Sequence, residues 1–424
     1  MRKTSFIIFI LIFAMLLTGC SLPSGEADLM LTPPTLSSGR EALTKAIKSA
    51  IGEAYELVYP QEGSYRTGII SVDLTGDGVT EAICFYRRIS DGKLGLLVMK
   101  SETDSSWSIL AKGISPAASV GRVEFGDLTG DGVAEIIVGW HYLSEADGSY
   151  EIYTMKEGKA VSCHSGLYTR FIMMGEAPLK LLVLSRNTAT KAVTASLIGA
   201  VSGGVGVINT VAMSERSTDF LNLLSAKTSN GHPAVYIDQS LESGQTITEV
   251  LVVNDHGRLT NELLNQTNNP TLRYTGVTSR DKENDGIPEI PTEEALPTYQ
   301  RNGVDENLYL VHWNTFDGQV LSPVSHSFVD TTEKFTLTYP DGWYGEVTVE
   351  RPADSERAFA FKTLEGEQLF TVRIYGLSEY TEEVSTAGWR KLYEDSDHVY
   401  TVLLEEENPL EIDYDVVYNA FNVI

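Results

Sequence analysis

Basic residues are scarce in this chain of 424 residues, where 32 Lys and Arg stand against 58 Asp and Glu and the formal net charge is −26. A protein that binds nucleic acid through its phosphates needs cationic side chains that displace counterions. The composition therefore argues against nucleic acid as a partner.

Cysteine is also scarce, and its three residues exclude a disulfide-stapled scaffold. Cys84 and Cys163 fall in strand-like runs, so we expect two buried thiols, with a disulfide between them as the alternative. Apolar residues make up 42% of the chain and charged residues 21%, which is enough for a large core. The length suggests two or three domains.

The apolar run at the N-terminus is too short for a membrane-spanning helix. It extends from Phe6 to Leu17, whereas a span needs roughly 18–20 apolar residues. Because Arg2 and Lys3 precede it and small residues follow, residues 1–19 are predicted to be a secretory signal peptide.

The end of this segment, Leu17-Thr18-Gly19-Cys20, resembles the lipobox of bacterial lipoproteins. The resemblance implies cleavage before Cys20, acylation of its thiol, and a lipid anchor on the extracytoplasmic face of the cell membrane. Residues 20–39 contain several Pro, Ser and Gly, so they are predicted to be a flexible tether.

One acidic pattern occurs three times. Residues 73–81 read D-L-T-G-D-G-V-T-E, residues 127–135 read D-L-T-G-D-G-V-A-E, and residues 281–289 read D-K-E-N-D-G-I-P-E. The first two follow strand-like residues and precede apolar β runs, whereas Pro291 predicts a short or displaced strand after the third.

The spacing suits calcium, which takes six to eight oxygen ligands. A tight loop can offer side chains at positions 1, 3, 5 and 9 and a carbonyl at position 7, with glycine at position 6 for the turn. The predicted ligands are Asp73, Thr75, Asp77, Val79 and Glu81 in the first loop, Asp127, Thr129, Asp131, Val133 and Glu135 in the second, and Asp281, Glu283, Asp285, Ile287 and Glu289 in the third.

Two alternatives to this type of loop exist. An EF-hand needs Glu at position 12, but the residues there are Cys84, Val138 and Thr292. Asp- and Gly-rich hairpin turns without metal are the second alternative, and recurrence with acids at positions 1, 5 and 9 favours metal over them. The extra carboxylate of Glu283 predicts tighter binding in the third loop, although Pro288 could distort it.

The loops resemble the FG-GAP repeats of integrin α-subunit β-propellers and their bacterial relatives, with Thr in place of Asp or Asn at position 3 in two copies. Residues 179–185 and 233–239 look like the strand after the loop without the loop itself. We take Glu81, Glu135, Lys180, Ala234 and Glu289 as equivalent points of successive modules. They are separated by 54, 45, 54 and 55 residues, a period that suits four-stranded blades. The resemblance implies a mainly β fold with about five propeller-like modules over residues 64–324. A β-sandwich with calcium hairpins is the alternative.

The segments before and after the predicted repeat have different sequence patterns. The apolar stripe of residues 40–59 predicts a helix within an N-terminal segment 40–63, packed on the propeller edge. Residues 325–424 are predicted to be a small α+β domain, with a helix over 386–394.

No sequence motif of a zinc hydrolase or of a serine hydrolase is present, and no specific carboxylate pair stands out. The sequence therefore predicts a lipid-anchored platform, stabilised by structural calcium, that binds protein or glycan. An envelope hydrolase that uses the propeller to position a glycan or peptide, and an accessory scaffold lipoprotein, are the alternatives.

Overall fold

The computed structural model describes residues 38–103, 106–143, 148–214, 216–263 and 269–424. The predicted signal peptide and the predicted acylation site Cys20 lie outside the described residues. Within them, no helix is both long and apolar enough to cross a membrane.

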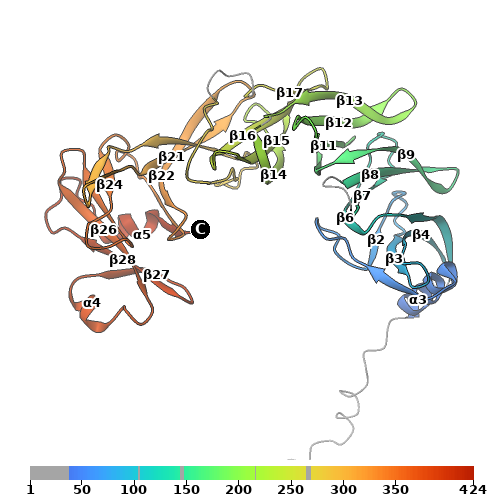
Figure 1. Ribbon diagram of the computed structural model, residues 1–424, viewed down its shortest axis with the longest axis horizontal. Coiled ribbons are helices and arrows are strands. Elements are labelled where there is room, and N and C mark those ends of the chain that lie inside the picture. The colour runs from blue at the N-terminus through green and yellow to red at the C-terminus, as the bar shows by residue number, and fades with distance from the viewer. Residues whose placement is uncertain (1–37, 104–105, 144–147, 215, 264–268) are drawn as a thin grey trace, which may run out of the picture.

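The described chain is mainly β. Five antiparallel sheets follow one another along the sequence, and a sixth belongs to the C-terminal part. In Figure 1 the sheets are arranged along an arc, with the first sheet and the C-terminal sheet at opposite ends. Within the described residues, no sheet combines strands of the first module with strands of the last. The modules therefore form an open arc.

The first three sheets are meanders, and in the first one both β1 and β2 lie along β3. The first sheet contains β1 (Tyr55–Val58), β2 (Ile69–Val72), β3 (Glu81–Arg88), β4 (Leu94–Thr103) and β5 (Ser106–Ser115). The second contains β6 (Ser119–Gly126), β7 (Glu135–His141), β8 (Gly148–Lys156) and β9 (Lys159–Tyr168). The third contains β10 (Arg170–Met174), β11 (Lys180–Arg186), β12 (Val193–Val201) and β13 (Gly204–Ala212).

The fourth sheet repeats this order, and the fifth recruits the C-terminal strand. The fourth contains β14 (Ser217–Lys227), β15 (Pro233–Leu241), β16 (Thr246–Val253) and β17 (Leu259–Asn261). The fifth contains β18 (Ile290–Ala295), β21 (Tyr309–Phe316), β22 (Leu321–Asp330), β23 (Phe335–Thr338) and β29 (Phe421–Val423), and a separate hairpin pairs β19 (Tyr299–Arg301) with β20 (Val304–Glu306).

The predicted repeat is confirmed strand by strand. The points taken as equivalent in the sequence fall within one residue of the starts of β3, β7, β11, β15 and β18. β7, β11 and β15 are the second strands of their modules, and β3 follows both β1 and β2. β18 comes first in the fifth sheet, because the strand that would precede it is reduced to one bridge between Arg280 and Glu289. The predicted fold, a mainly β propeller-like repeat followed by a small α+β part, is therefore correct.

The core consists of separate apolar layers, each enclosed by two consecutive sheets. Phe85 of the first sheet and Trp140 of the second belong to one layer, with ring centroids 5.8 Å apart. Further layers join the second to the third sheet, the third to the fourth, and the fourth to the fifth. Because central sheets bury both faces, strands such as β3, β7 and β16 are buried along almost their whole length.

The N-terminal helix α3 (Ser38–Ile51) is shorter than predicted. Its apolar face, which includes Leu43 and Ile47, packs on β3 and β4 as expected. Gly52 follows with φ of 77°, donates its N–H to the carbonyl of Lys48, and ends the helix. The rest of the predicted helix is wrong, because residues 55–58 pair with β3 instead.

The C-terminal part contains a five-stranded sheet and two short helices. Its strands are β24 (Val347–Glu350), β25 (Ala358–Thr363), β26 (Gln368–Gly376), β28 (His398–Leu404) and β27 (Arg390–Glu394), and its helices are α4 (Glu382–Thr386) and α5 (Tyr414–Ala420). The helix predicted over 386–394 is wrong. Gly388, with φ of 96°, separates α4 from β27, which pairs with β28.

Cys84 and Cys163, the two described cysteines, form no disulfide with each other. Cys84 is buried, as expected. Cys163 is exposed, so the expectation of a second buried thiol is wrong; its Sγ donates to the carbonyl of Ile152 at 3.3 Å.

Candidate functional site

The three acidic loops occupy corresponding places in the first, second and fifth modules. Each ends in a glutamate at or next to the start of the strand that follows it, β3, β7 or β18. These glutamates are buried, with exposures of 0% for Glu81, 0% for Glu135 and 1% for Glu289. Burial raises the pKa of all three carboxyl groups above the ordinary value.

The loops share one hydrogen-bond pattern. In each, the position-1 aspartate accepts the N–H of the position-6 glycine, the position-5 aspartate accepts the N–H of residue 7, and the position-9 glutamate accepts the N–H of residue 2. The distances are 2.8, 2.9 and 2.8 Å in the first loop, 2.9, 2.9 and 2.8 Å in the second, and 2.9, 2.8 and 2.8 Å in the third. The glycines have φ of 82°, 84° and 86°, which only glycine adopts readily.

The carboxylates at positions 1, 5 and 9 thus accept N–H groups of their own loop. Within the described ranges, no group of three or more His, Cys, Asp or Glu side chains is arranged to hold a metal ion. A carboxylate oxygen has two acceptor sites, so an N–H bond does not exclude a cation. In the first loop Thr75 Oγ1 and Glu81 Oε1 are buried without a hydrogen-bond partner among the described residues, and Lys100 Nζ lies 3.9 Å from Glu81 Oε1. The calcium ligands stay a prediction.

The first loop differs from the second in the residue opposite its glutamate. Lys100 pairs with Glu81 across β3 and β4, and its Nζ lies 2.7 Å from Asp77 Oδ2 and 3.9 Å from Glu81 Oε1. The hydrogen bond from Lys100 lowers the pKa of Asp77. In the second loop Thr154 takes this place and donates to Glu135 Oε1 at 2.9 Å. The first loop therefore already contains a cation of its own.

A cleft lies between the first and second modules, and sequence reasoning missed it. Its volume is about 670 Å³, within the range of ligand sites. One wall comes from residues 113–116 at the end of β5, and the other from β7, β8 and β9. Four aromatic side chains contribute to its lining: Trp140, Tyr142, Tyr150 and Tyr153.

Polar groups accompany these rings. Tyr153 donates to Glu151 Oε2 at 2.6 Å, and the hydroxyls of Tyr142 and Ser149 are 3.1 Å apart. The hydroxyl of Tyr150 is 3.0 Å from Nε2 of His164, and burial raises the pKa of this hydroxyl to about 12, so it stays protonated at neutral pH. The buried Nε1 of Trp140 has no hydrogen-bond partner. The cleft can therefore combine stacking surfaces with hydrogen-bond donors and acceptors.

Four further aromatic side chains belong to the C-terminal part. Trp343 is buried in the core and Tyr344 is half exposed. Trp389 lies against Tyr375, with ring centroids 5.9 Å apart, and Tyr393 lies against Tyr400 at 6.2 Å. These side chains line none of the clefts described above.

Comparison with known proteins identifies no family. No family model matches the chain, and no curated protein matches it. Among solved structures, the exotype rhamnogalacturonan lyase YesX is 12% identical with a TM-score of 0.31, covering 73% of this chain and 75% of that one. An exo-β-1,3-galactanase from Phanerochaete chrysosporium is 9% identical with a TM-score of 0.30, covering 77% and 81%. The Dos1 propeller is 11% identical with a TM-score of 0.31, covering 82% and 81%. These TM-scores are too low to support a functional inference.

Proposed function

We propose that this protein is a lipid-anchored binding platform of the cell envelope and that the cleft between its first two modules binds a neutral glycan. The aromatic lining of that cleft carries the proposal: Tyr142 and Tyr153 are partly exposed, whereas Trp140 and Tyr150 are 3% and 4% exposed and support them from the core. A sugar ring has an apolar C–H face and a rim of hydroxyls. Aromatic rings with polar tips match both parts of such a ligand.

The charge of the protein and of the cleft lining limits the kind of glycan that the cleft can bind. The chain has a net charge of −26, and among the described lining residues the one ionisable carboxylate is Glu151, with no Lys or Arg beside it. A polyanionic glycan would be repelled and would find no cation to pair with. An uncharged glycan therefore fits this lining better than an acidic one.

The same lining favours binding over hydrolysis. Glycosidases mostly use two carboxyl groups that flank the scissile bond. Among the described residues of the cleft, Glu151 has no second carboxyl group to act with. Hydrolysis by this cleft is therefore the weaker alternative.

Substitution of Tyr142 by alanine is expected to weaken glycan binding at least tenfold, because one wall loses its stacking surface. The measurement is binding of the purified protein to an array of neutral, amino and acidic oligosaccharides, followed by titration of the best neutral ligand. Glu151→Gln is expected to weaken the same ligand while keeping the shape of the cleft. Tyr418→Ala, which removes an exposed tyrosine of α5, is the matched control. Retention of acidic oligosaccharides alone, or equal losses in the control, would contradict the proposal.

We further propose that calcium stabilises the second and third loops, which resemble FG-GAP loops. Asp127, Asp131 and Glu135 would hold the ion in the second loop, and Asp281, Glu283, Asp285 and Glu289 in the third. A bound cation would offset the mutual repulsion of these carboxylates, and its binding energy would add to the stability of the folded state. In the first loop the ammonium group of Lys100, in place of an ion, offsets the repulsion between the carboxylates of Asp77 and Glu81.

The calcium proposal predicts opposite effects for two substitutions. For the unchanged protein, calcium at about a hundredfold excess over Kd should add about 2.7 kcal/mol per site to the free energy of unfolding. Asp131→Asn should reduce this gain, and Lys100→Met should increase it because the first loop becomes available. Thermal melting in CaCl2 and in EDTA measures both. A melting temperature that is the same in CaCl2 and EDTA for all three proteins would refute the proposal.

A further inference from the structure

Two histidines and a glutamate lie together on three neighbouring strands of the fifth sheet. His312 of β21 and His326 of β22 are directly opposite each other in the antiparallel register. Glu294 of β18 is diagonal to His312, since Thr292 is the direct partner of His312. Such positions bring long side chains within contact distance.

The side chains meet through their polar atoms. Nδ1 of His312 is 2.6 Å from Nδ1 of His326, and Nε2 of His312 is 3.0 Å from Glu294 Oε2. Tyr344 donates to the same carboxylate oxygen at 3.2 Å, and its ring stacks on His326 with centroids 4.1 Å apart and planes 11° apart. Two imidazoles are thus held with their Nδ1 atoms facing each other.

The contact of His312 with Glu294 determines which nitrogen of His312 carries the proton. An ionised carboxylate can only accept, so Nε2 of His312 carries the proton and its Nδ1 accepts the Nδ1–H of His326. A metal ion that binds both Nδ1 atoms displaces this proton, and His326 then carries its proton on Nε2. A carboxylate that holds the far N–H of a histidine in this way is the usual support of a metal-ligating imidazole. Imidazole nitrogens suit zinc, copper and nickel.

We propose that His312 and His326 bind a divalent transition-metal ion, Cu²⁺, Ni²⁺ or Zn²⁺, through their Nδ1 atoms, and that Glu294 orients His312. Metal–nitrogen bonds of about 2.0–2.1 Å require the two nitrogens to separate to roughly 3 Å, a small rotation of each ring. His312 is 14% exposed at its side chain and Glu294 54%, so an ion can reach the pair.

This site differs from the acidic loops in its chemistry. Its two protein ligands are nitrogens, and within the described residues no third His, Cys, Asp or Glu completes the set. The remaining coordination positions therefore belong to water or to an oxygen of a bound ligand. The ion is expected to exchange with solution, unlike one enclosed in a structural site.

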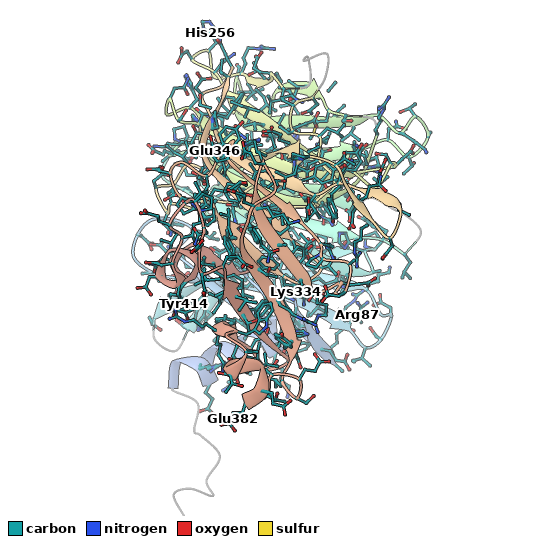
Figure 2. All side chains as sticks on the ribbon, turned by 90° about the vertical axis from the view of Figure 1, so that its left-hand side faces the viewer. Arg87, His256, Lys334, Glu346, Glu382 and Tyr414 are labelled. Atoms are coloured by element: carbon teal, nitrogen blue, oxygen red, sulfur yellow. The ribbon has the colours of Figure 1, made fainter. Side chains whose placement is uncertain are left out.

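The test is titration of the full chain, without a polyhistidine tag, with ZnCl2 and separately with CuCl2, in the presence of excess CaCl2 to occupy the acidic loops. We expect saturable binding that His326→Ala abolishes and that Glu294→Gln weakens about 10- to 100-fold. Glu294→Gln removes an exposed charge and keeps the side-chain shape, so it tests the site even where His326→Ala fails to fold. His256→Ala is the matched control, because His256 is exposed at the top edge of the molecule in Figure 2.

Electron paramagnetic resonance of the Cu²⁺ form provides a second readout. Two imidazole nitrogens should couple to the copper electron spin in the unchanged protein, and this two-nitrogen coupling should be lost in His312→Ala. No saturable binding, or binding that His326→Ala and Glu294→Gln leave unchanged, would mean that the residues form a hydrogen-bonded pair only and would overturn the proposal.

Discussion

Substitution of Arg273 by methionine is expected to lower the free energy of unfolding by about 3–5 kcal/mol, the usual result of removing one partner of a buried ion pair. Arg273 and Asp238 are both 0% exposed, and Arg273 Nη2 lies 2.7 Å from Asp238 Oδ1. Arg273 also donates to Thr248 and to the carbonyls of Thr271 and Val277. Its loss would leave a buried carboxylate without its counter-charge.

Urea unfolding measures this loss, and two further variants test its cause. Glu242→Gln breaks an exposed pair with Lys191, 64% and 72% exposed, and should cost about 0–1 kcal/mol. The double variant Asp238→Leu with Arg273→Met should recover part of the stability, because no charge is then buried alone. A loss below about 1 kcal/mol for Arg273→Met would show that Asp238 does not depend on it.

Substitution of Phe328 by alanine is expected to cost about 3–5 kcal/mol and to loosen two sheets together. Phe328 belongs to β22 of the fifth sheet, yet its ring centroid lies 5.3 Å from Phe359 and 5.7 Å from Phe361 of the C-terminal sheet. The two sheets share one apolar core. The deletion therefore leaves a cavity that neither sheet can close alone.

Amide hydrogen exchange distinguishes a shared core from two independent domains. In Phe328→Ala, exchange should accelerate in β21 and β22 and equally in β25 and β26. Phe220→Ala, a buried phenylalanine of the fourth sheet, is the matched control and should mainly affect its own layer between the third and fourth sheets. Acceleration confined to one of the two sheets around Phe328 would contradict a shared core.

This core bears on the predicted division of the chain. The boundary predicted between residues 324 and 325 falls inside β22, and β29 at the C-terminus pairs with β23 in the same fifth sheet. The sequence pattern changes near residue 325, but the pairing of β22 with β21 continues across this position. A strand at the start or end of a predicted domain can pair with a sheet of the neighbouring domain, and local composition does not reveal which sheet it joins.

The repeat was accessible to sequence reasoning because its signals are local. A glycine at position 6 and acids at positions 1, 5 and 9 define one loop within nine residues, and the apolar run after each loop marks the following strand. This holds even for β11 and β15, which lack the acidic loop. Helix periodicity failed at residues 52–59, because Gly52 ends the helix and pairing with β3 overrides the local pattern.

The cleft and the histidine pair were not accessible in this way. Trp140 and Tyr153 come from two different strands, and their opposite wall comes from β5 of another module. His312 and His326 are 14 positions apart, and their contact depends on the register between β21 and β22, which includes an irregularity after Trp313. A slip of one residue would turn one of the rings to the other face of the sheet.

The sequence by itself therefore determined the acidic turns and the modular β architecture, since each depends on neighbouring residues. Only the tertiary structure decided that Lys100 enters one loop, that aromatic rings meet between two modules, and that two imidazoles face each other. These contacts join residues distant in sequence, and strand register and sheet packing alone determine which distant side chains touch.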